Sequence, residues 1–194
     1  MSSRFLKSVR ICLCGFICLI QTHSAFADVV QNRALIKKIN ARCISIDLSL
    51  APVTTLHQLL EPTMPWDDFF NRYTTMHEAD FKKTMSVANV IIQKATQVFD
   101  LEGRPFIFSN WKWPTNQSLL DTLKSEQILF ITGSNNQGHA KPMDIHTQAC
   151  SNHAIDTLQF SFNVNLYPLN VIAADDYQTV LTRQAPFATI EFLK

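Results

Sequence analysis

Hydrophobic and polar residues alternate strictly in two stretches of this sequence. In the first stretch, Ile44 to Leu50, every second side chain is apolar and the residues between are Ser or Asp. In the second, the same alternation runs from Leu158 to Leu166. A period of two is typical of a β-strand with one face on a core. Two shorter apolar runs, 179–183 and 187–193, predict two further strands that turn at Ala185-Pro186.

The region before residue 126 mostly shows apolar residues at intervals of three or four, the period of an amphipathic helix. Thr75 and Glu78 have the spacing of a capping box, and Thr115 is placed to cap a later helix. Short apolar runs at 106–108 and 128–131 predict two more strands, and 133–142 is loop-like. The expected helices cover 29–42, 54–60, 66–74, 76–100 and 116–125.

This order of elements defines the expected fold class. Helices mainly first and strands mainly last favour an α+β domain, in which N-terminal helices pack on a C-terminal antiparallel sheet. The sequence contains no internal repeat, low-complexity tract or linker that would divide it. We therefore expect one folded domain.

The first 27 residues have the three regions of an export signal. Basic residues come first, a ten-residue apolar run covers 11–20, and Ala25-Phe26-Ala27 precedes a cut before Asp28. A membrane-spanning helix needs about 20 apolar residues, so we expect cleavage rather than a retained anchor. The three cysteines of the signal lack the small preceding residue of a lipobox, so lipidation is not expected. The sequence thus predicts a periplasmic or secreted domain over 28–194.

Removal of the signal changes the charge of the chain. It leaves 14 basic against 16 acidic residues, a formal charge of −2, and no basic cluster. A slightly acidic domain of this kind argues against nucleic acid as the partner. No other segment is apolar enough to cross a membrane.

Catalytic motifs are missing from the sequence. The mature chain has only three glycines and none of the common phosphate-loop, nucleophile-elbow, metalloprotease or C-x-x-C patterns. These absences favour a non-enzymatic protein, and no cofactor is predicted, although a zinc site is one alternative considered below.

Two cysteines, Cys43 and Cys150, remain after the signal. An exported protein with an even number of cysteines usually pairs them. The bond would close a loop of about 107 residues, for which chain entropy predicts roughly 4–5 kcal/mol of stabilisation. The alternative is two buried free thiols.

The only concentration of metal-ligating residue types is the stretch 139–153. It holds His139, Asp144, His146 and His153, and imidazole and carboxylate are ordinary zinc ligands. Pro142 argues against one helix across all three histidines, although 143–153 could be helical. The alternative is a polar surface loop whose cysteine belongs to the disulfide.

Aromatic residues form a second candidate site. Such side chains on a helix and at a nearby corner can line a concave ligand pocket, although they more often form plain core. The residues concerned are Trp66, Phe70, Tyr73, Trp111 and Trp113.

The C-terminal half resembles the IcmL/DotI-like periplasmic domains of type IVB secretion systems, which are NTF2-like cones. The residues that carry the resemblance are Val98-Phe99-Asp100-Leu101-Glu102-Gly103, followed by a short helix at 118–124, a strand at 128–131 and a terminal strand at 188–192. The family's tryptophan after the glycine is replaced here by Arg104-Pro105. The resemblance implies a helix-covered curved sheet and an accessory role in an envelope secretion assembly.

Three functions are compatible with these observations. The first is a non-enzymatic exported domain that binds a protein partner, as an accessory component of an envelope or secretion assembly. The second is a domain that binds a small ligand or metal through the aromatic set or the 139–153 loop. The third is a secreted hydrolase whose site is assembled from scattered residues.

Overall fold

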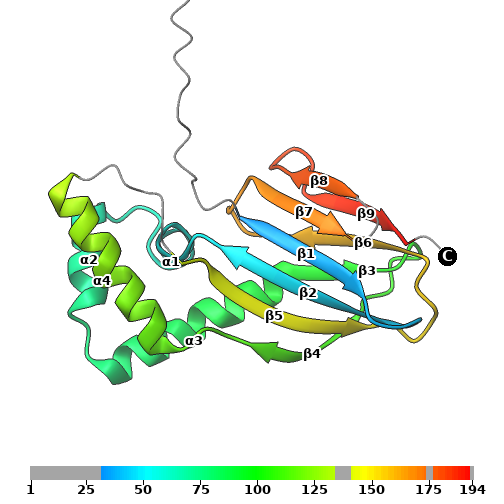
Figure 1. The fold of residues 1–194 in the computed structure, drawn as a ribbon, viewed down its shortest axis with the longest axis horizontal. Coiled ribbons are helices and arrows are strands. Elements are labelled where there is room, and N and C mark those ends of the chain that lie inside the picture. Colours follow the sequence, from blue (N-terminus) through cyan, green and yellow to red (C-terminus); the bar gives the residue numbers. More distant parts are fainter. Residues whose placement is uncertain (1–31, 134–140, 174–176, 193–194) are drawn as a thin grey trace, which may run out of the picture.

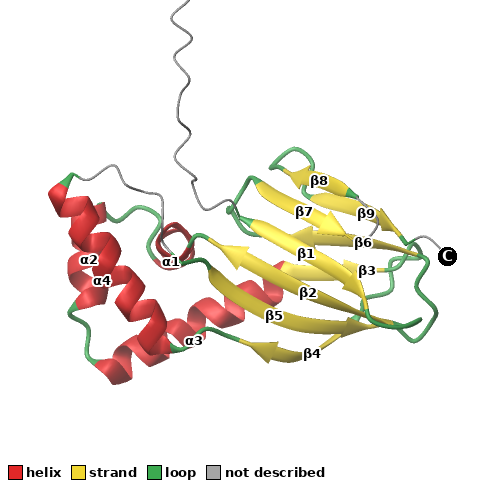
Figure 2. Ribbon diagram, in the orientation of Figure 1, coloured by secondary structure: helices red, strands yellow, loops and turns green. Residues whose placement is uncertain are grey.

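A computed structural model describes residues 32–133, 141–173 and 177–192, which form four helices and nine strands (Figures 1 and 2). The predicted α+β class is therefore confirmed. The expected export signal lies outside the described residues. In chain order the elements are β1 (Arg33–Lys38), β2 (Cys43–Leu50), α1 (Pro52–Leu60), α2 (Trp66–Thr74), α3 (Glu78–Ala95), β3 (Thr96–Phe99), β4 (Ile107–Lys112), α4 (Asn116–Thr132), β5 (Met143–Cys150), β6 (Thr157–Phe162), β7 (Leu169–Ala173), β8 (Gln178–Leu181) and β9 (Phe187–Glu191).

The strands form two sheets. One has six strands in the order β4-β5-β2-β1-β7-β8, and the other has three in the order β3-β6-β9. Every pairing is antiparallel except that of β1 with β7, which is parallel. Strands β1 and β2 precede all the helices in the chain, yet they occupy the middle of the larger sheet. The expected order, with helices first and a C-terminal sheet after them, did not place N-terminal strands there.

The inner faces of the two sheets share one hydrophobic core. Alternate residues of β2, from Ile44 to Leu50, are buried, and so are alternate residues of β6. Phe160 and Phe162 of β6 are fully inaccessible to solvent. Complete burial of such a side chain contributes about 1.5–3 kcal/mol, so these strands are central to stability. The period of two is confirmed for β2 and for 158–162. The predicted continuation of the second strand to Leu166 is wrong, because β6 ends at Phe162.

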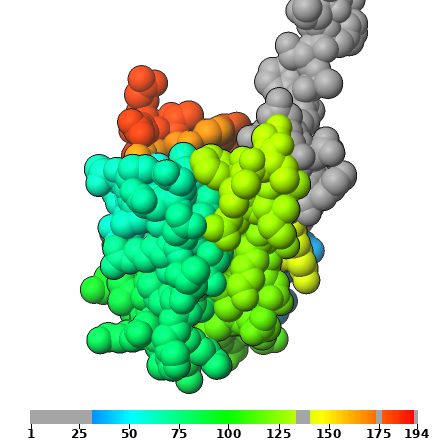
Figure 3. Space-filling view, turned by 90° about the vertical axis from the view of Figure 1, so that its left-hand side faces the viewer, coloured from blue at the N-terminus to red at the C-terminus, as the bar shows by residue number. Residues whose placement is uncertain are grey.

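Three of the helices gather at one end of the molecule. Figure 1 shows α1, α2 and α4 together beyond the ends of the strands, while α3 runs toward the sheets and continues into β3. Figure 3 shows α2 and α4 side by side on this end. Across their contact, Phe70 lies 5.4 Å from Phe130 between ring centroids, and Thr74 donates a hydrogen bond to Gln127. The two helices are therefore antiparallel.

The predicted helix at 29–42 is wrong across its described part, because residues 33–38 form strand β1. Ala34 and Ile36 are buried while Arg33 and Lys37 are exposed, a period of two. The strand pairs with β2 on one side and β7 on the other. These long-range hydrogen bonds outweigh a weak helical periodicity that local sequence could not distinguish from a strand.

The helix predicted over 76–100 begins and ends differently. His77, not Thr75, is the N-cap of α3, and its Nδ1 accepts a hydrogen bond from the backbone N–H of Ala79. The helix ends at Ala95, and 96–99 pairs with β6 as strand β3. The capping-box prediction is therefore wrong, since the Thr75 hydroxyl donates to the carbonyl of Asn71 instead.

Two further predictions are corrected by the structure, and one strand was missed. The strand expected at 128–131 belongs to α4, which Thr115 caps as predicted and which continues to Thr132. The alternative helix at 143–153 is excluded by β5. Strand β7 was not predicted at all, because its five residues, LNVIA, are too short for a clear period. No helix in the described part of the chain is long and apolar enough to span a membrane.

Candidate functional site

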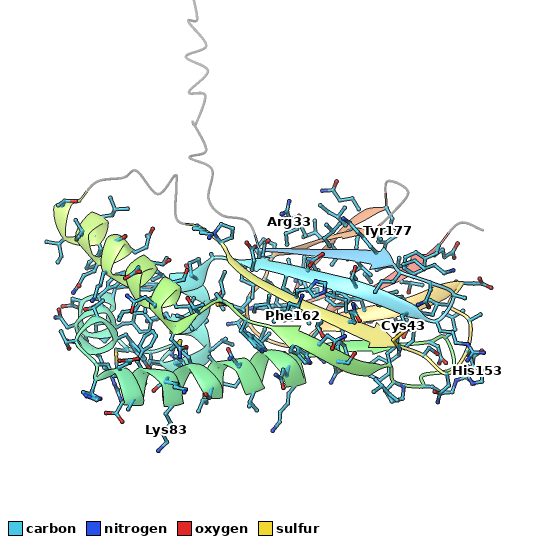
Figure 4. The ribbon with its side chains drawn as sticks, turned by 60° about the horizontal axis from the view of Figure 1, so that its bottom comes forward. Arg33, Cys43, Lys83, His153, Phe162 and Tyr177 are labelled. Carbon is cyan, nitrogen blue, oxygen red and sulfur yellow. A yellow bond between two sulfur atoms is a disulfide. The ribbon has the colours of Figure 1, made fainter. Side chains whose placement is uncertain are left out.

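The disulfide predicted from the cysteine count is present between Cys43 and Cys150. The two residues stand directly opposite each other on β2 and β5, with their Cα atoms 4.2 Å apart. This is the close spacing of a non-hydrogen-bonded antiparallel pair. Figure 4 shows Cys43 at the end of the sheet remote from the helices. Cys150 is thus consumed by the bond and is available neither as a nucleophile nor as a metal ligand.

The candidate metal ligands fall into different surroundings. His139 lies outside the described residues. Asp144 accepts a hydrogen bond from Ser49 Oγ at 2.6 Å, and His146 pairs through Nδ1 with Asp47. His153 follows β5 at the end of the molecule near Cys43 (Figure 4). Within the described ranges no three residues of the types His, Cys, Asp and Glu converge on a point where a metal ion would bind.

His153 borders a small cavity of about 200 Å³ between the turns that follow β3 and β5. In the same wall, Asp100 pairs with Arg104. Although desolvation opposes it, hydrogen bonding from Arg104 lowers the pKa of Asp100, which keeps the carboxylate charged. The Arg104 guanidinium also pairs with Glu102, so one cation faces two carboxylates and this wall keeps a net negative charge.

The five candidate aromatic residues lie in two separate clusters. On α2, Phe70 and Tyr73 are buried, and Tyr73 packs against Phe69 at 4.6 Å between ring centroids. Burial, with a contribution from the Glu61 carboxylate, raises the pKa of Tyr73. At the end of β4, Trp111 stacks on Trp113 at 5.4 Å between ring centroids and 11° between ring planes. No ring of one cluster contacts a ring of the other in the described part of the chain.

Trp66 is held in place by a buried histidine that the sequence did not distinguish. The Trp66 ring stacks on His57 of α1 at 4.0 Å and 22°, and it meets Phe69 edge-on. His57 Nε2 lies 2.7 Å from the carbonyl of Met64. The side chain of Trp66 is nevertheless 37% exposed. Its indole is therefore a fixed, accessible aromatic surface at the helical end.

The helical end also exposes the last turn of α4. Four consecutive apolar residues precede Thr132, the last residue of this helix, and three of them are strongly exposed: Ile128 by 62%, Phe130 by 50% and Ile131 by 72%. We call the set Trp66, Ile128, Phe130 and Ile131 the apolar end. Phe70 connects its two parts, since it contacts both Trp66 and Phe130. The same run was predicted as a buried strand, so the sequence located the apolar residues but not their exposure.

A polar arrangement occupies the outer face of the six-stranded sheet. The strand registers place Asp47 of β2, His146 of β5 and Lys112 of β4 in one row across three neighbouring strands. The Asp47 carboxylate accepts from His146 Nδ1 at 2.6 Å. Neither Asp47 nor Lys112 was singled out from sequence. The only signal for Asp47 was its outward position in the alternation of 44–50.

Comparison with models of protein families, with curated proteins and with solved structures finds no match to this chain.

Proposed function

We propose that this chain is an exported, non-enzymatic accessory protein that binds a protein partner through the apolar end. The observation that carries the proposal is the exposure of Ile128, Phe130 and Ile131 within a single turn of α4. Scattered apolar residues on a surface need no explanation, but a contiguous apolar patch marks an interaction site. A fixed aromatic ring beside it, Trp66, is the type of residue that dominates the energy of protein interfaces.

The surroundings of the apolar end specify the chemistry of the partner. Because α2 and α4 are antiparallel, Asp67 in the first turn of α2 lies at the same end of the helix pair as Ile131. Asp68 is exposed beside it. The last turn of α4 carries no basic residue, and the carbonyl end of a helix is negative. The patch is therefore apolar, and its border toward the start of α2 is negative.

A protein segment with apolar side chains flanked by Lys or Arg fits such a patch best. Burying the apolar residues supplies affinity at about 25 cal/mol per Å², while the flanking charges set orientation and association rate. An anionic lipid surface fits less well, because Asp67 and Asp68 would be repelled by it.

The export of the chain and its place in a secretion assembly belong to the same proposal. The disulfide supports export, since disulfides form and persist in oxidising compartments. An NTF2-like cone and a role like that of the IcmL/DotI-like domains rest on the sequence resemblance. Cell fractionation with N-terminal sequencing tests the export part: a mature protein that begins at Asp28 supports it, and a cytoplasmic protein with an intact N-terminus contradicts it.

The partner proposal is tested with two matched double variants. Ile128→Ser with Ile131→Ser removes two side chains of the apolar end, and Val87→Ser with Val90→Ser removes an exposed apolar pair from the outer face of α3. Each variant is purified from native envelopes after mild cross-linking, and its circular dichroism is compared with wild type to verify folding.

We expect wild type and the α3 control to co-purify with the same partner at fixed stoichiometry. The amount of partner recovered with the α4 variant should be at least tenfold lower. Purified wild type and partner should then bind directly, with weaker binding at higher salt because the border is charged. A wild-type protein that always runs alone and monomeric, or an α4 variant that retains its partner, would overturn the proposal.

A further inference from the structure

An open cavity of about 480 Å³ lies over strands β4 and β5. Its size is in the range of small-molecule sites in proteins. The five residues that line it are Asn110, Trp111, Lys112, His146 and Gln148. None of them carries a carboxylate.

A β-bulge shapes this cavity. The register of β4 against β5 shifts between Ser109 and Lys112, and Asn110 within the bulge has a φ of 57°, in the left-handed region that Asn tolerates better than most residues. The bulge brings the Asn110 side chain across to β5, where its Nδ2 donates to Gln148 Oε1 at 2.9 Å. The Gln148 oxygen is thus occupied, and its amide N–H groups are left for the cavity.

The pairing of His146 with Asp47 has a similar effect. A carboxylate can only accept, so the proton shared between Asp47 Oδ1 and His146 lies on Nδ1. The pairing fixes the ring and leaves Nε2 as the ring nitrogen available to the cavity. With one proton on Nδ1, Nε2 donates to a ligand only in the doubly protonated ring, whose charge the Asp47 carboxylate balances.

Lys112 supplies the positive charge of the cavity. The register places it opposite His146, and it is exposed. It forms no salt bridge with any residue in the described ranges. Residues with an ammonium, an imidazole and a primary amide therefore line one cavity, and the Gln148 Oε1 oxygen already accepts a hydrogen bond from Asn110.

We infer that this cavity binds a small molecule through an oxyanion group, a carboxylate or a phosphate. The group is recognised by Lys112 Nζ, His146 Nε2 and the amide of Gln148. Charge-assisted hydrogen bonds of this kind are roughly twice as strong as neutral ones. A metal cation is disfavoured at the same place, because the lining offers an ammonium and no carboxylate.

The test is a titration of the full mature protein with inorganic phosphate, with acetate and, as a cation of similar size, with tetramethylammonium chloride. Binding is followed by ¹H–¹⁵N NMR of the backbone amides of β4 and β5 and of the side-chain amides of Asn110 and Gln148. We expect saturable shifts at these positions with one or both anions and none with the cation. The anion that binds more tightly distinguishes a phosphate site from a carboxylate site.

Two substitutions at Lys112 and one distant control make the test specific. Lys112→Met should weaken anion binding at least tenfold, whereas Lys112→Arg should largely retain it. Lys83→Met removes the same charge from α3, where Figure 4 shows Lys83 pointing away from the body of the molecule, and should leave binding unchanged. Because Lys112 is exposed, its variants should fold, which thermal unfolding verifies.

Two outcomes would refute the inference: no saturable shift in β4 and β5 with either anion, or equal weakening by Lys112→Met and Lys83→Met. The partner proposal is tested independently of the anion site, because the Ile128→Ser, Ile131→Ser variant should bind the anion as wild type does.

Discussion

The disulfide between Cys43 and Cys150 makes the most quantitative prediction about this protein. Its removal by Cys43→Ala with Cys150→Ala should leave the native structure in place, because β2 and β5 remain paired over eight registered positions. The effect is instead on the unfolded chain, which regains the entropy that the cross-link removes. For a sequence separation of 107 residues the chain-entropy relation predicts a loss of about 4.8 kcal/mol at 25 °C.

A loss of this size is a large part of the stability of an ordinary domain, which is about 5–15 kcal/mol. It should be measured by urea unfolding, followed by circular dichroism, for oxidised wild type, reduced wild type and the double variant. The denaturant slope should rise when the cross-link is absent, because the unfolded chain then exposes more surface. Intact mass supplies the check that the bond exists: the oxidised protein should be two hydrogens lighter than the reduced one.

Equal masses would show that the cysteines are not paired. A proven bond whose removal changes the free energy of unfolding by less than about 1 kcal/mol would refute the entropic reasoning, and would indicate that the unfolded chain already keeps the two strands close.

Three further predictions concern packing, capping and charge. Phe160→Ala, at a fully buried position between the sheets, should reduce the free energy of unfolding by about 3–5 kcal/mol in urea titrations, and a loss below 1 kcal/mol would contradict the sandwich core. Thr115→Ala removes the hydroxyl that accepts from the Ser118 N–H and should cost about 1 kcal/mol, whereas Thr115→Ser should restore most of it. Burial raises the pKa of Glu126, so the folded state binds its proton more tightly than the unfolded state does. The contribution of Glu126 to the free energy of unfolding is fully present below the ordinary glutamate pKa. It is lost as the pH rises through the raised pKa of the folded state. Glu126→Gln should therefore be the more stable protein at neutral pH and equal to wild type in acid, and a pH-independent difference in melting temperature would contradict this.

The elements that were predictable from sequence are those with strong local signals. β2 and β6 alternate cleanly because one face of each packs on the core, and α2 has the helical spacing of Trp66, Phe70 and Tyr73. Thr115 precedes α4 as an ordinary N-cap. In each case the residues that determine the element lie within it, so a local pattern is sufficient.

The wrong predictions concern segments whose conformation depends on distant partners. Residues 33–38 form a strand because β2 and β7 bind both of its edges, and β7 is more than 130 positions away. Residues 96–99 leave the helical pattern of α3 because β6 offers hydrogen bonds there. A run of apolar residues such as 128–131 fits a buried strand or a helix end equally well until its neighbours are known.

The candidate sites show the same difference between features that local sequence determines and features that depend on distant residues. The cysteine count and the predicted compartment led to the Cys43–Cys150 pair without a structure. The sequence also drew attention to His146 and Trp66, but it grouped them with the wrong neighbours. His146 was placed with other histidines of its own loop, whereas its partner is Asp47, 99 residues earlier in the chain.

By itself, then, the sequence determined which faces of its clearest strands and helices are apolar, which two cysteines pair, and that the chain is an α+β protein. The export of the chain stays a prediction. The tertiary structure alone decided that Ile128, Phe130 and Ile131 remain exposed, and that Asp47, His146 and Lys112 lie in one row. The physical reason is that periodicity and capping are properties of neighbouring residues, whereas exposure and convergence depend on strand order and register. Those are set by contacts between residues far apart in the chain.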